Sequence, residues 1–244
     1  MTLGVRIRNA DSSLVQIDPL YQNLALKQSG IARTSHFSES PYAPATTGSV
    51  TIQSSGCNEP IIIIKCDGVF VGLRSRSQSG TTYTWQLISS VAVVDIQYWI
   101  FDTTDVAQMA FNSPFGMRIR SPIDGSIVFD SRYKYMRILS VINTSAGTAE
   151  QTYTTPIQSG FGVGFGNASL STAVAGGPVS GGGEWFFQVE VHVSGFMTTS
   201  SGEIKSRLIT LMSFTNQGTG NPPYTGGIGG SRSAVALVTD IRNY

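Results

Sequence analysis

The chain shows almost no helical periodicity and consists instead of short runs in which apolar and polar residues alternate. These runs are rich in β-branched and aromatic residues, and Gly, Pro, Asn and Asp separate them. Alternation with a period of two places successive side chains on opposite faces of a strand, whereas a helix repeats every ~3.6 residues. Most prolines fall between the runs, as strands require because proline has no N–H for the ladder. The sequence therefore predicts an all-β protein, an antiparallel sandwich or a barrel-like build.

Strands are predicted at residues 5–8, 14–17, 50–53, 61–65, 69–73, 83–88, 91–101, 116–120, 127–130, 136–142, 160–166, 185–193, 204–214 and 234–241. Long connections without strands are predicted at 34–48 and 216–231, and a flexible Gly-rich connection at 175–183. Asp67-Gly68 and Asp124-Gly125 are predicted to form tight hairpin turns, because glycine accepts the positive φ that such turns need. Connections this long are uncommon unless they bind a partner or stay flexible. We expect Gly- and Pro-rich connections such as 216–230 to be arms that become ordered in the assembly and bind there.

Charge is sparse in this chain and nearly balanced. Charged residues make up 13% of the sequence, against about 25% in an average soluble protein. The formal net charge is +1, so we expect no nucleic-acid partner and no attraction to anionic lipid. No apolar run approaches the roughly 20 residues of a membrane span, and no signal-peptide run opens the chain. We therefore predict no membrane insertion and folding in a cytoplasm.

The few cysteines and histidines do not suggest a metal site or a disulfide. Cys57 and Cys66 flank a strand-like run of isoleucines, and at about 3.3 Å per extended residue their Cα atoms would lie well beyond the ~7 Å limit for a disulfide. Both are therefore predicted to be free thiols. With 2 His and 2 Cys in total, and no metal-ligand spacing between them, we expect no metal and no cofactor.

One segment of the sequence is repeated. Residues 4–8 (GVRIR) return at 116–120 (GMRIR), an offset of 112 residues, and the same offset aligns Asp18 with Asp130. It also aligns apolar residues with apolar residues across the following strand. We therefore predict related hairpins at 4–26 and 116–138 within a single β-rich unit of residues 1–244, whose C-terminal part, 143–244, is rich in Gly and Ser. The rest of the two halves does not align, so the sequence supports a repeated hairpin rather than a duplicated domain.

Alternation places the arginines of the repeat on one face of their strands, and these are Arg6, Arg8, Arg118 and Arg120. Two interpretations stay open. In one, the arginines lie on a solvated face and pair with Asp18 and Asp130 across the hairpins. In the other, they form an interface that docks onto a neighbouring subunit through multidentate hydrogen bonds. Tyr224, in the 216–231 connection, is a further candidate interface residue.

No catalytic motif is present in recognisable spacing. Glu190 and His192 share one face of a predicted strand, an arrangement that suits a general base and its carboxylate, or simply a polar pair on an outer face. Residues 160–166 carry glycine at every second position, but they do not open a helix and so lack the dinucleotide-binding fingerprint. We expect them to form a strand whose bare face accepts a closely packed neighbour. No enzymatic activity is expected.

The opening residues 4–18 (GVRIRNADSSLVQID) resemble the start of small tail proteins of long-tailed, siphovirus-like bacteriophages. Those proteins begin with a Gly-x-x-Ile-x-Asn hairpin and later carry an aromatic strand, similar to 98–102 (YWIFD), and a second hairpin copy, similar to 116–131. The likeness covers residues 4–142 and departs at Ser12-Ser13, where a glycine is usual. The resemblance implies a multi-copy, symmetric and non-enzymatic virion component of the tail tip or tail fibre.

We therefore expect a structural component of a bacteriophage virion, located in the tail, that contributes to assembly and host attachment. Its expected partners are other tail proteins of the same particle, further copies of itself in a symmetric homo-oligomer, and a host-surface receptor. Two alternatives stay open: a carbohydrate-binding adhesin module with Tyr224 as a stacking platform, and a capsid decoration protein. Trp85 and Trp99 lie in apolar strands and are expected in the core.

Overall fold

The structure, a computed structural model, describes residues 7–8, 15–17, 23–38, 42–145, 149–178, 184–219, 227–230 and 233–244. These residues form strands, bridges, turns and bends and no helix. Every strand pairs antiparallel with its neighbours. The prediction of an all-β, sandwich-like architecture is confirmed.

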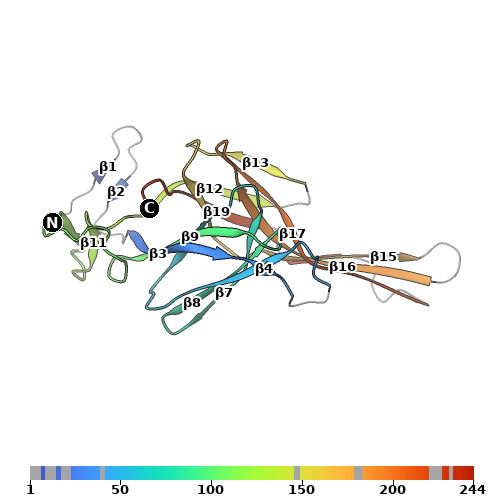
Figure 1. The fold of residues 1–244 in the computed structure, drawn as a ribbon. Helices are drawn as coiled ribbons and strands as arrows, with labels where there is room; N and C mark the ends of the chain where they lie inside the picture. The colour runs from blue at the N-terminus through green and yellow to red at the C-terminus, as the bar shows by residue number, and fades with distance from the viewer. Residues whose placement is uncertain are drawn as a thin grey trace.

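Two sheets form the body of the molecule (Figure 1). The six-stranded sheet has the order β12-β19-β14-β6-β9-β3. Its strands are β3 (Leu24–Arg33), β6 (Ile61–Lys65), β9 (Asp95–Thr103), β12 (Arg137–Ser145), β14 (Phe161–Phe165) and β19 (Ser233–Asp240).

The nine-stranded sheet has the order β13-β17-β16-β7-β8-β5-β4, and β15 joins it by pairing with both β16 and β18. Its strands are β4 (Ser35–His36), β5 (Gly48–Ser54), β7 (Val71–Ser79), β8 (Thr82–Ser89), β13 (Gln151–Thr154), β15 (Leu170–Pro178), β16 (Glu184–Thr198), β17 (Glu203–Thr219) and β18 (Gly227–Gly230). Two separate hairpins complete the fold: β1 (Ile7–Arg8) with β2 (Val15–Ile17), and β10 (Arg118–Arg120) with β11 (Ile127–Asp130).

The two sheets pack face to face, and the side chains between them form the core. One cluster joins Ile62, Ile64 and Ile100 of the six-stranded sheet to Trp85 and Leu87 of the nine-stranded sheet. A second cluster joins Phe161, Val163 and Val238 to Phe196 and Ile204 in the same way. Trp85 and Trp99 are both buried, which confirms their expected place in the core.

The edge strands β3 and β12 of the six-stranded sheet meet at one end of the body. The Leu26 amide donates to the Lys134 carbonyl at 2.7 Å, and the Met136 amide donates to the Leu24 carbonyl at 2.8 Å. The bend that brings them together encloses a further apolar cluster around Ile63 and Phe101. The start of β3 and the residues that lead into β12 therefore lie side by side.

The strand order of both sheets repeats about their centres. In the six-stranded sheet, β3-β9-β6 of the first half is matched by β12-β19-β14 of the second. In the nine-stranded sheet, β5-β8-β7 is matched by β13-β17-β16. The central pairs, β6 with β14 and β7 with β16, are antiparallel, as an approximate two-fold axis between the halves requires. The repetition thus extends through the body, well beyond the hairpins.

The registers of the edge strands repeat residue by residue. In the first half, β3 pairs with β9 through Ala25–Asp102, Leu26–Phe101 and Gln28–Ile100. In the second half, β12 pairs with β19 through the equivalent pairs Arg137–Asp240, Ile138–Thr239 and Ser140–Val238. The pairing register shifts at the equivalent position in both halves: Lys27 in β3 and Leu139 in β12 have no paired residue on the neighbouring strand. The residues of β3 and β12 follow the offset of 112 that relates the hairpins, although no residue of Leu24–Arg33 is identical to its equivalent in 136–145. The two strands therefore share their backbone pattern without any identical residue, although Leu24 and Leu26 match Met136 and Ile138 in apolar character.

The glycines of β14 accept a neighbouring side chain, as the alternation predicts. A Cβ added to Gly164 would lie 2.5 Å from Cδ1 of Ile63, and one added to Gly162 would lie 2.7 Å from Cγ2 of the same residue. Ile63 is fully buried against this bare face. Ile63 and Gly164 pair directly across the approximate two-fold axis, so a large residue of one half fits the glycine of the other.

Several predicted boundaries are wrong. Residues 91–94 are not part of a strand, because the chain crosses there from β8 in one sheet to β9 in the other. The predicted connections at 175–183 and 216–231 contain strand residues of β15, β17 and β18. Asp67-Gly68 forms a turn with a positive φ at Gly68, but it joins strands of different sheets rather than a hairpin. Asp124-Gly125 does form the turn of the β10–β11 hairpin, with Gly125 at a φ of 75°.

Both cysteines are free and buried, which confirms the prediction of free thiols. Burial, together with the smaller effect of the nearby Asp67 carboxylate, raises the pKa of the Cys66 thiol to about 11. Because the thiolate is the reactive form, we expect both cysteines to react with a thiol reagent such as Ellman's reagent at pH 8 only after unfolding. Titration in buffer and in 6 M guanidinium chloride measures this; rapid reaction of either thiol in buffer would contradict the expectation.

Candidate functional site

The β10–β11 hairpin carries two of the four arginines singled out by the repeat. Arg118 pairs directly with Asp130 across the ladder, and its Nε donates to Asp130 Oδ2 at 2.8 Å. Arg120 donates from Nη1 to the Gly125 carbonyl at 2.7 Å and is exposed. Arg118 thus makes the intramolecular pair that one interpretation of the repeat expected.

The remaining interface candidates are placed less fully. Arg8 lies in β1, where its backbone pairs with Val15, and its side chain lies outside the described part of the structure. Arg6, Tyr224 and Asp18 lie outside the described residues. Their role in an interface stays a prediction.

Asp130 is a buried anion at the centre of this hairpin. Besides Arg118, it accepts hydrogen bonds from Arg132 through the backbone N–H at 3.0 Å, Nε at 2.9 Å and Nη2 at 2.6 Å. These hydrogen bonds from Arg132, with that from Arg118, hold the pKa of the Asp130 carboxyl well below its usual range, against the opposing effect of burial. The charges of the hairpin are therefore largely satisfied within the chain.

Replacement of Asp130 by Asn is expected to loosen the hairpin while the body stays folded. Loss of the charge-assisted hydrogen bonds should lower its local opening free energy by about 2 kcal/mol, measured by hydrogen exchange of the amides of 118–130. Because the folded-state pKa is depressed, the wild-type protection should be complete near pH 7 and decline as the pH falls below about 4. Asp124→Asn is the matched control, since Asn can still accept the Ser126 hydrogen bonds. Equal protection in both variants would contradict the prediction.

The same hairpin and the connection before it expose large apolar side chains, namely Met109, Phe111, Phe115, Met117 and Ile123. Phe115 is 84% exposed and Ile123 is 79% exposed. We refer to these five side chains as the apolar patch. Exposed apolar side chains that gather in one segment of a protein commonly mark a contact with another macromolecule. The sequence pattern did not predict their exposure, because exposure depends on the hairpin standing away from the sheets.

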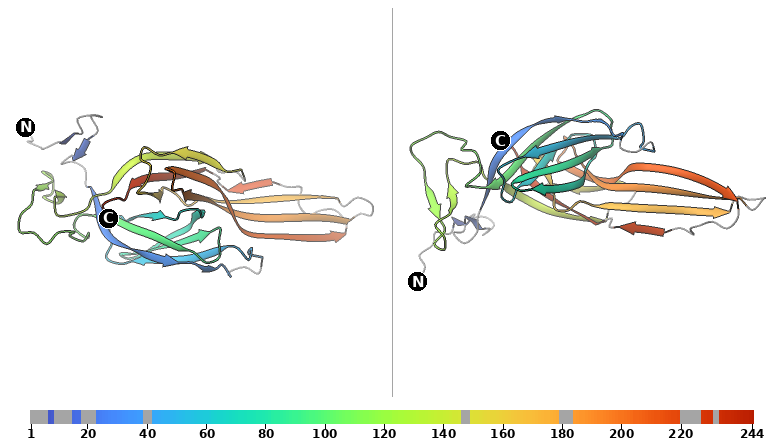
Figure 2. Two further views of the ribbon diagram at one scale, coloured as in Figure 1. Left: turned by 45° about the horizontal axis from the view of Figure 1, so that its top comes forward. Right: turned by 90° about the horizontal axis from the view of Figure 1, so that it is seen from below.

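A long arm extends from the opposite end of the body (Figures 1 and 2). We define the arm as residues 170–178, 184–191, 211–219 and 227–230, which belong to β15, β16, β17 and β18. In the first half the equivalent connections are short, at 66–70 between β6 and β7 and at 90–94 between β8 and β9. The arm is therefore an insertion into one copy of the repeated unit.

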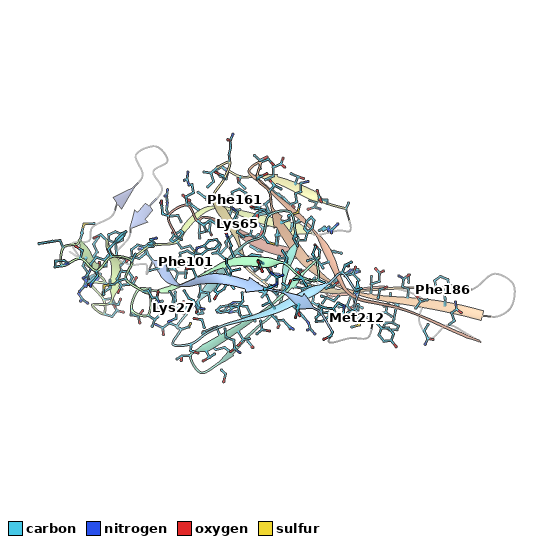
Figure 3. The ribbon with its side chains drawn as sticks, in the orientation of Figure 1. Lys27, Lys65, Phe101, Phe161, Phe186 and Met212 are labelled. Atoms are coloured by element: carbon cyan, nitrogen blue, oxygen red, sulfur yellow. The ribbon has the colours of Figure 1, made fainter. Side chains whose placement is uncertain are left out.

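The β16–β17 ladder is regular from Glu184 to Val191 and shifts register at the base of the arm, between Val191 and His192. Beyond Phe214, both edges of the arm are open among the described residues. Within the described residues, β18 pairs only with β15, and no strand pairs with the outer edge of β17 after Ser206. Figure 3 shows Met212 and Phe186 along the arm. An open edge presents backbone N–H and C=O groups that another strand can pair with.

A loop of the first half supports the base of the arm. The Tyr42 ring packs against Phe214 with the ring centroids 5.1 Å apart, and the Ser213 amide donates to the Tyr42 carbonyl at 3.1 Å. Thr47 Oγ1 donates to the Thr210 carbonyl at 3.1 Å. The predicted 34–48 connection is thus a brace between the two halves. Among the residues described there, it contains β4 and, at Gly48, the first residue of β5.

A pocket of about 460 Å³ lies where the arm joins the body. Its polar lining includes Thr46, Ser90, Arg207 and the strand residues Glu190, His192 and Thr210. His192 Nε2 lies 3.2 Å from Glu190 Oε2, and its Nδ1 lies 3.3 Å from Thr210 Oγ1. The sequence correctly placed Glu190 and His192 on one face.

The environment of His192 differs from an outer-face polar pair, because the side chain is buried. Glu190 lies within hydrogen-bond distance of one ring nitrogen and Thr210 within hydrogen-bond distance of the other, so each nitrogen has a polar partner. This arrangement fixes the ring and adds hydroxyl and carboxylate groups to the pocket wall. In the described part of the chain, no group of three or more His, Cys, Asp or Glu side chains is placed to hold a metal ion.

Compared with protein family models, curated proteins and solved structures, the chain matches none. No helix of membrane-spanning length and hydropathy occurs in the part of the chain that the structure describes.

Proposed function

We propose that the chain is a non-enzymatic structural component of a bacteriophage virion, at the tail tip or tail fibre, that contributes to assembly and host attachment. The observation that carries the proposal is the arm. It is inserted into only one half of a repeated body, and among the described residues no strand pairs with the free edge of β18 or with the outer edge of β17 beyond Phe214. A strand ribbon of this kind adds little to a core and gains stability by pairing with another chain.

The hairpins support the same proposal. Their sequences resemble those of siphovirus tail proteins, and they stand outside the sheets at the end of the body opposite the arm (Figure 2). The molecule thus presents contact elements at both ends. This is the layout expected of a subunit that links two layers of an assembly.

Immunogold labelling of purified particles from the source, with antibody against this chain, tests the location. Label at one end of the tail supports the proposal. Label over the head would favour a capsid decoration protein instead, and absence of label from every particle would overturn a virion role.

Shortening the arm is expected to abolish incorporation into particles and leave the body folded. Val174 and Val189 pair directly, so residues 175–188 can be replaced by Asn-Gly, the preferred two-residue hairpin turn. We expect a melting temperature within a few degrees of wild type, because the removed residues lie outside the core clusters. The matched control replaces Gly80-Thr81, the turn of the β7–β8 hairpin, by Asn-Gly. Normal incorporation of the shortened chain, measured by immunoblot of purified particles, would contradict the role of the arm.

A second candidate, a carbohydrate-binding adhesin, is favoured by the pocket at the arm base. Its hydroxyl, carboxylate, imidazole and guanidinium groups are the donors and acceptors that bind sugar hydroxyls. Glycan-array binding by the purified chain that is lost in Glu190→Gln would support this candidate. Turnover of a glycan, likewise lost in Glu190→Gln, would point to a hydrolase.

A further inference from the structure

The two hairpins are the part of the repeat in which sequence and backbone register are both preserved. Ile7 pairs with Ile17 and Arg8 with Val15, and the ladder shifts between these pairs. The β10–β11 hairpin repeats this pattern with Ile119–Phe129 and Arg120–Ile127, and it shifts at the same step. In the body, by contrast, equivalent strands keep the register and share almost no residues.

Packing does not account for this difference. Core positions accept many combinations of apolar residues, so equivalent strands of the two halves can diverge while their fold persists. None of the residues 104–132, all of which the structure describes, belongs to the buried apolar clusters of the body. Val128 is buried, but its equivalent in the first hairpin is Gln16, so its burial does not explain the shared residues. The Arg118–Asp130 pair within the hairpin accounts for the repeated arginine and aspartate. The apolar character of positions 115 and 117, which the sequence repeats at positions 3 and 5, is not explained by that pair and points to a contact outside the chain.

The surface of the second hairpin is suited to a protein contact. Its exposed Phe115 and Met117 form part of the apolar patch, while the Arg118 and Arg132 charges are matched by Asp130 within the hairpin. In the sequence, the positions equivalent to Phe115 and Met117 are Leu3 and Val5, which are also apolar. Figures 1 and 2 show both hairpins at the end of the body opposite the arm.

We infer that the two hairpins are equivalent docking elements that bind identical apolar sites on two neighbouring copies of one subunit in a homo-oligomeric tail partner. Two like elements on one chain require two like sites, and adjacent identical sites are what a symmetric oligomer provides. Binding of the first hairpin raises the effective concentration of the second, so the pair holds far more tightly than either alone. This inference rests on the proposed virion function.

The test uses the full-length chain and tail particles purified from a source-phage mutant that lacks it. Binding is measured for wild type, Leu3→Asp, Phe115→Asp and the double variant. Ile31→Asp serves as the control, because Ile31 is also a well exposed apolar side chain, on the edge strand β3. We expect each single variant to weaken binding at least about tenfold and to a similar extent, the double variant to bind at background level, and the control to match wild type.

If one of the two single variants binds like wild type while the other loses all binding, the hairpins are not equivalent. Full binding by the double variant would overturn the inference altogether. Wild-type self-association that Phe115→Asp removes, measured by light scattering without particles, would instead identify a second copy of the chain as the occupant. If the wild-type chain is absent from virions and does not bind the particles, the proposed function itself fails. That outcome is read from the wild-type chain alone and is therefore distinct from the results with the hairpin variants.

Discussion

Produced as separate chains, residues 1–112 and 113–244 are expected to be insoluble alone and to form a soluble one-to-one complex when produced together. Two apolar clusters contain residues from both halves: one joins Phe70 and Ile88 to Val193, and the other joins Ile63 to Ile241. Each half alone would also expose the strand edges that β6, β7, β14 and β16 now cover. Co-expression followed by size-exclusion chromatography with light scattering measures the outcome.

When both halves are present, the complex of the two different halves is expected to form in preference to a dimer of either half. In a dimer of the first half, Ile63 would meet a second Ile63 on the axis, and in a dimer of the second half, Gly164 would meet Gly164 and leave a cavity. Either arrangement is less favourable than the observed fit of Ile63 against Gly164. A clash or a cavity in the wrong pairing makes the correct pairing the preferred one. A soluble, folded and monomeric half produced alone would contradict the prediction.

The second large effect concerns the same contact. Gly164→Val is expected to lower the free energy of unfolding by about 3 kcal/mol, because the added methyl groups occupy the space of Ile63. Ile63→Ala is expected to cost about 3 kcal/mol, through the cavity it leaves. The double variant should lose less than the sum by at least about 1 kcal/mol, since the valine fills part of that cavity.

Denaturant unfolding monitored by tryptophan fluorescence provides the free energies for this cycle. The control pairs Gly164→Val with Ile88→Ala, a buried residue of a different apolar cluster, for which the two effects should add. Additivity of Gly164→Val with Ile63→Ala would show that the two side chains are not coupled.

Local features of the fold were predictable from the sequence because they depend on neighbouring residues. The Asp124-Gly125 turn, the bare face of 160–166 and the alternation in 185–193 each follow from a few adjacent side chains. Strand β3 was missed because its ladder shifts at Lys27, whose ammonium binds the Gly56 and Val106 carbonyls instead of continuing the alternation. The glycines and proline at the end of β15 likewise hid a strand.

The site and the symmetry of the body depend on residues far apart in the chain. Ile63 and Gly164 occupy equivalent positions of the two halves and pair with each other. Their side chains differ so much in size that the sequence gives no sign of this equivalence. The pocket unites Thr46, Ser90 and His192 through strand pairing that no local pattern specifies. Glu190 and His192 were placed together because only their own strand was involved.

The course of β16 has a mechanical consequence. This strand runs from the arm to the centre of the nine-stranded sheet, where Gly195 and Phe196 pair with β7. A pull on the arm along its length would therefore put β16 and β17 under tension together and load their pairings with β7 and β13 in shear. Tension at the arm would thus reach the middle of the body without passing through a flexible joint.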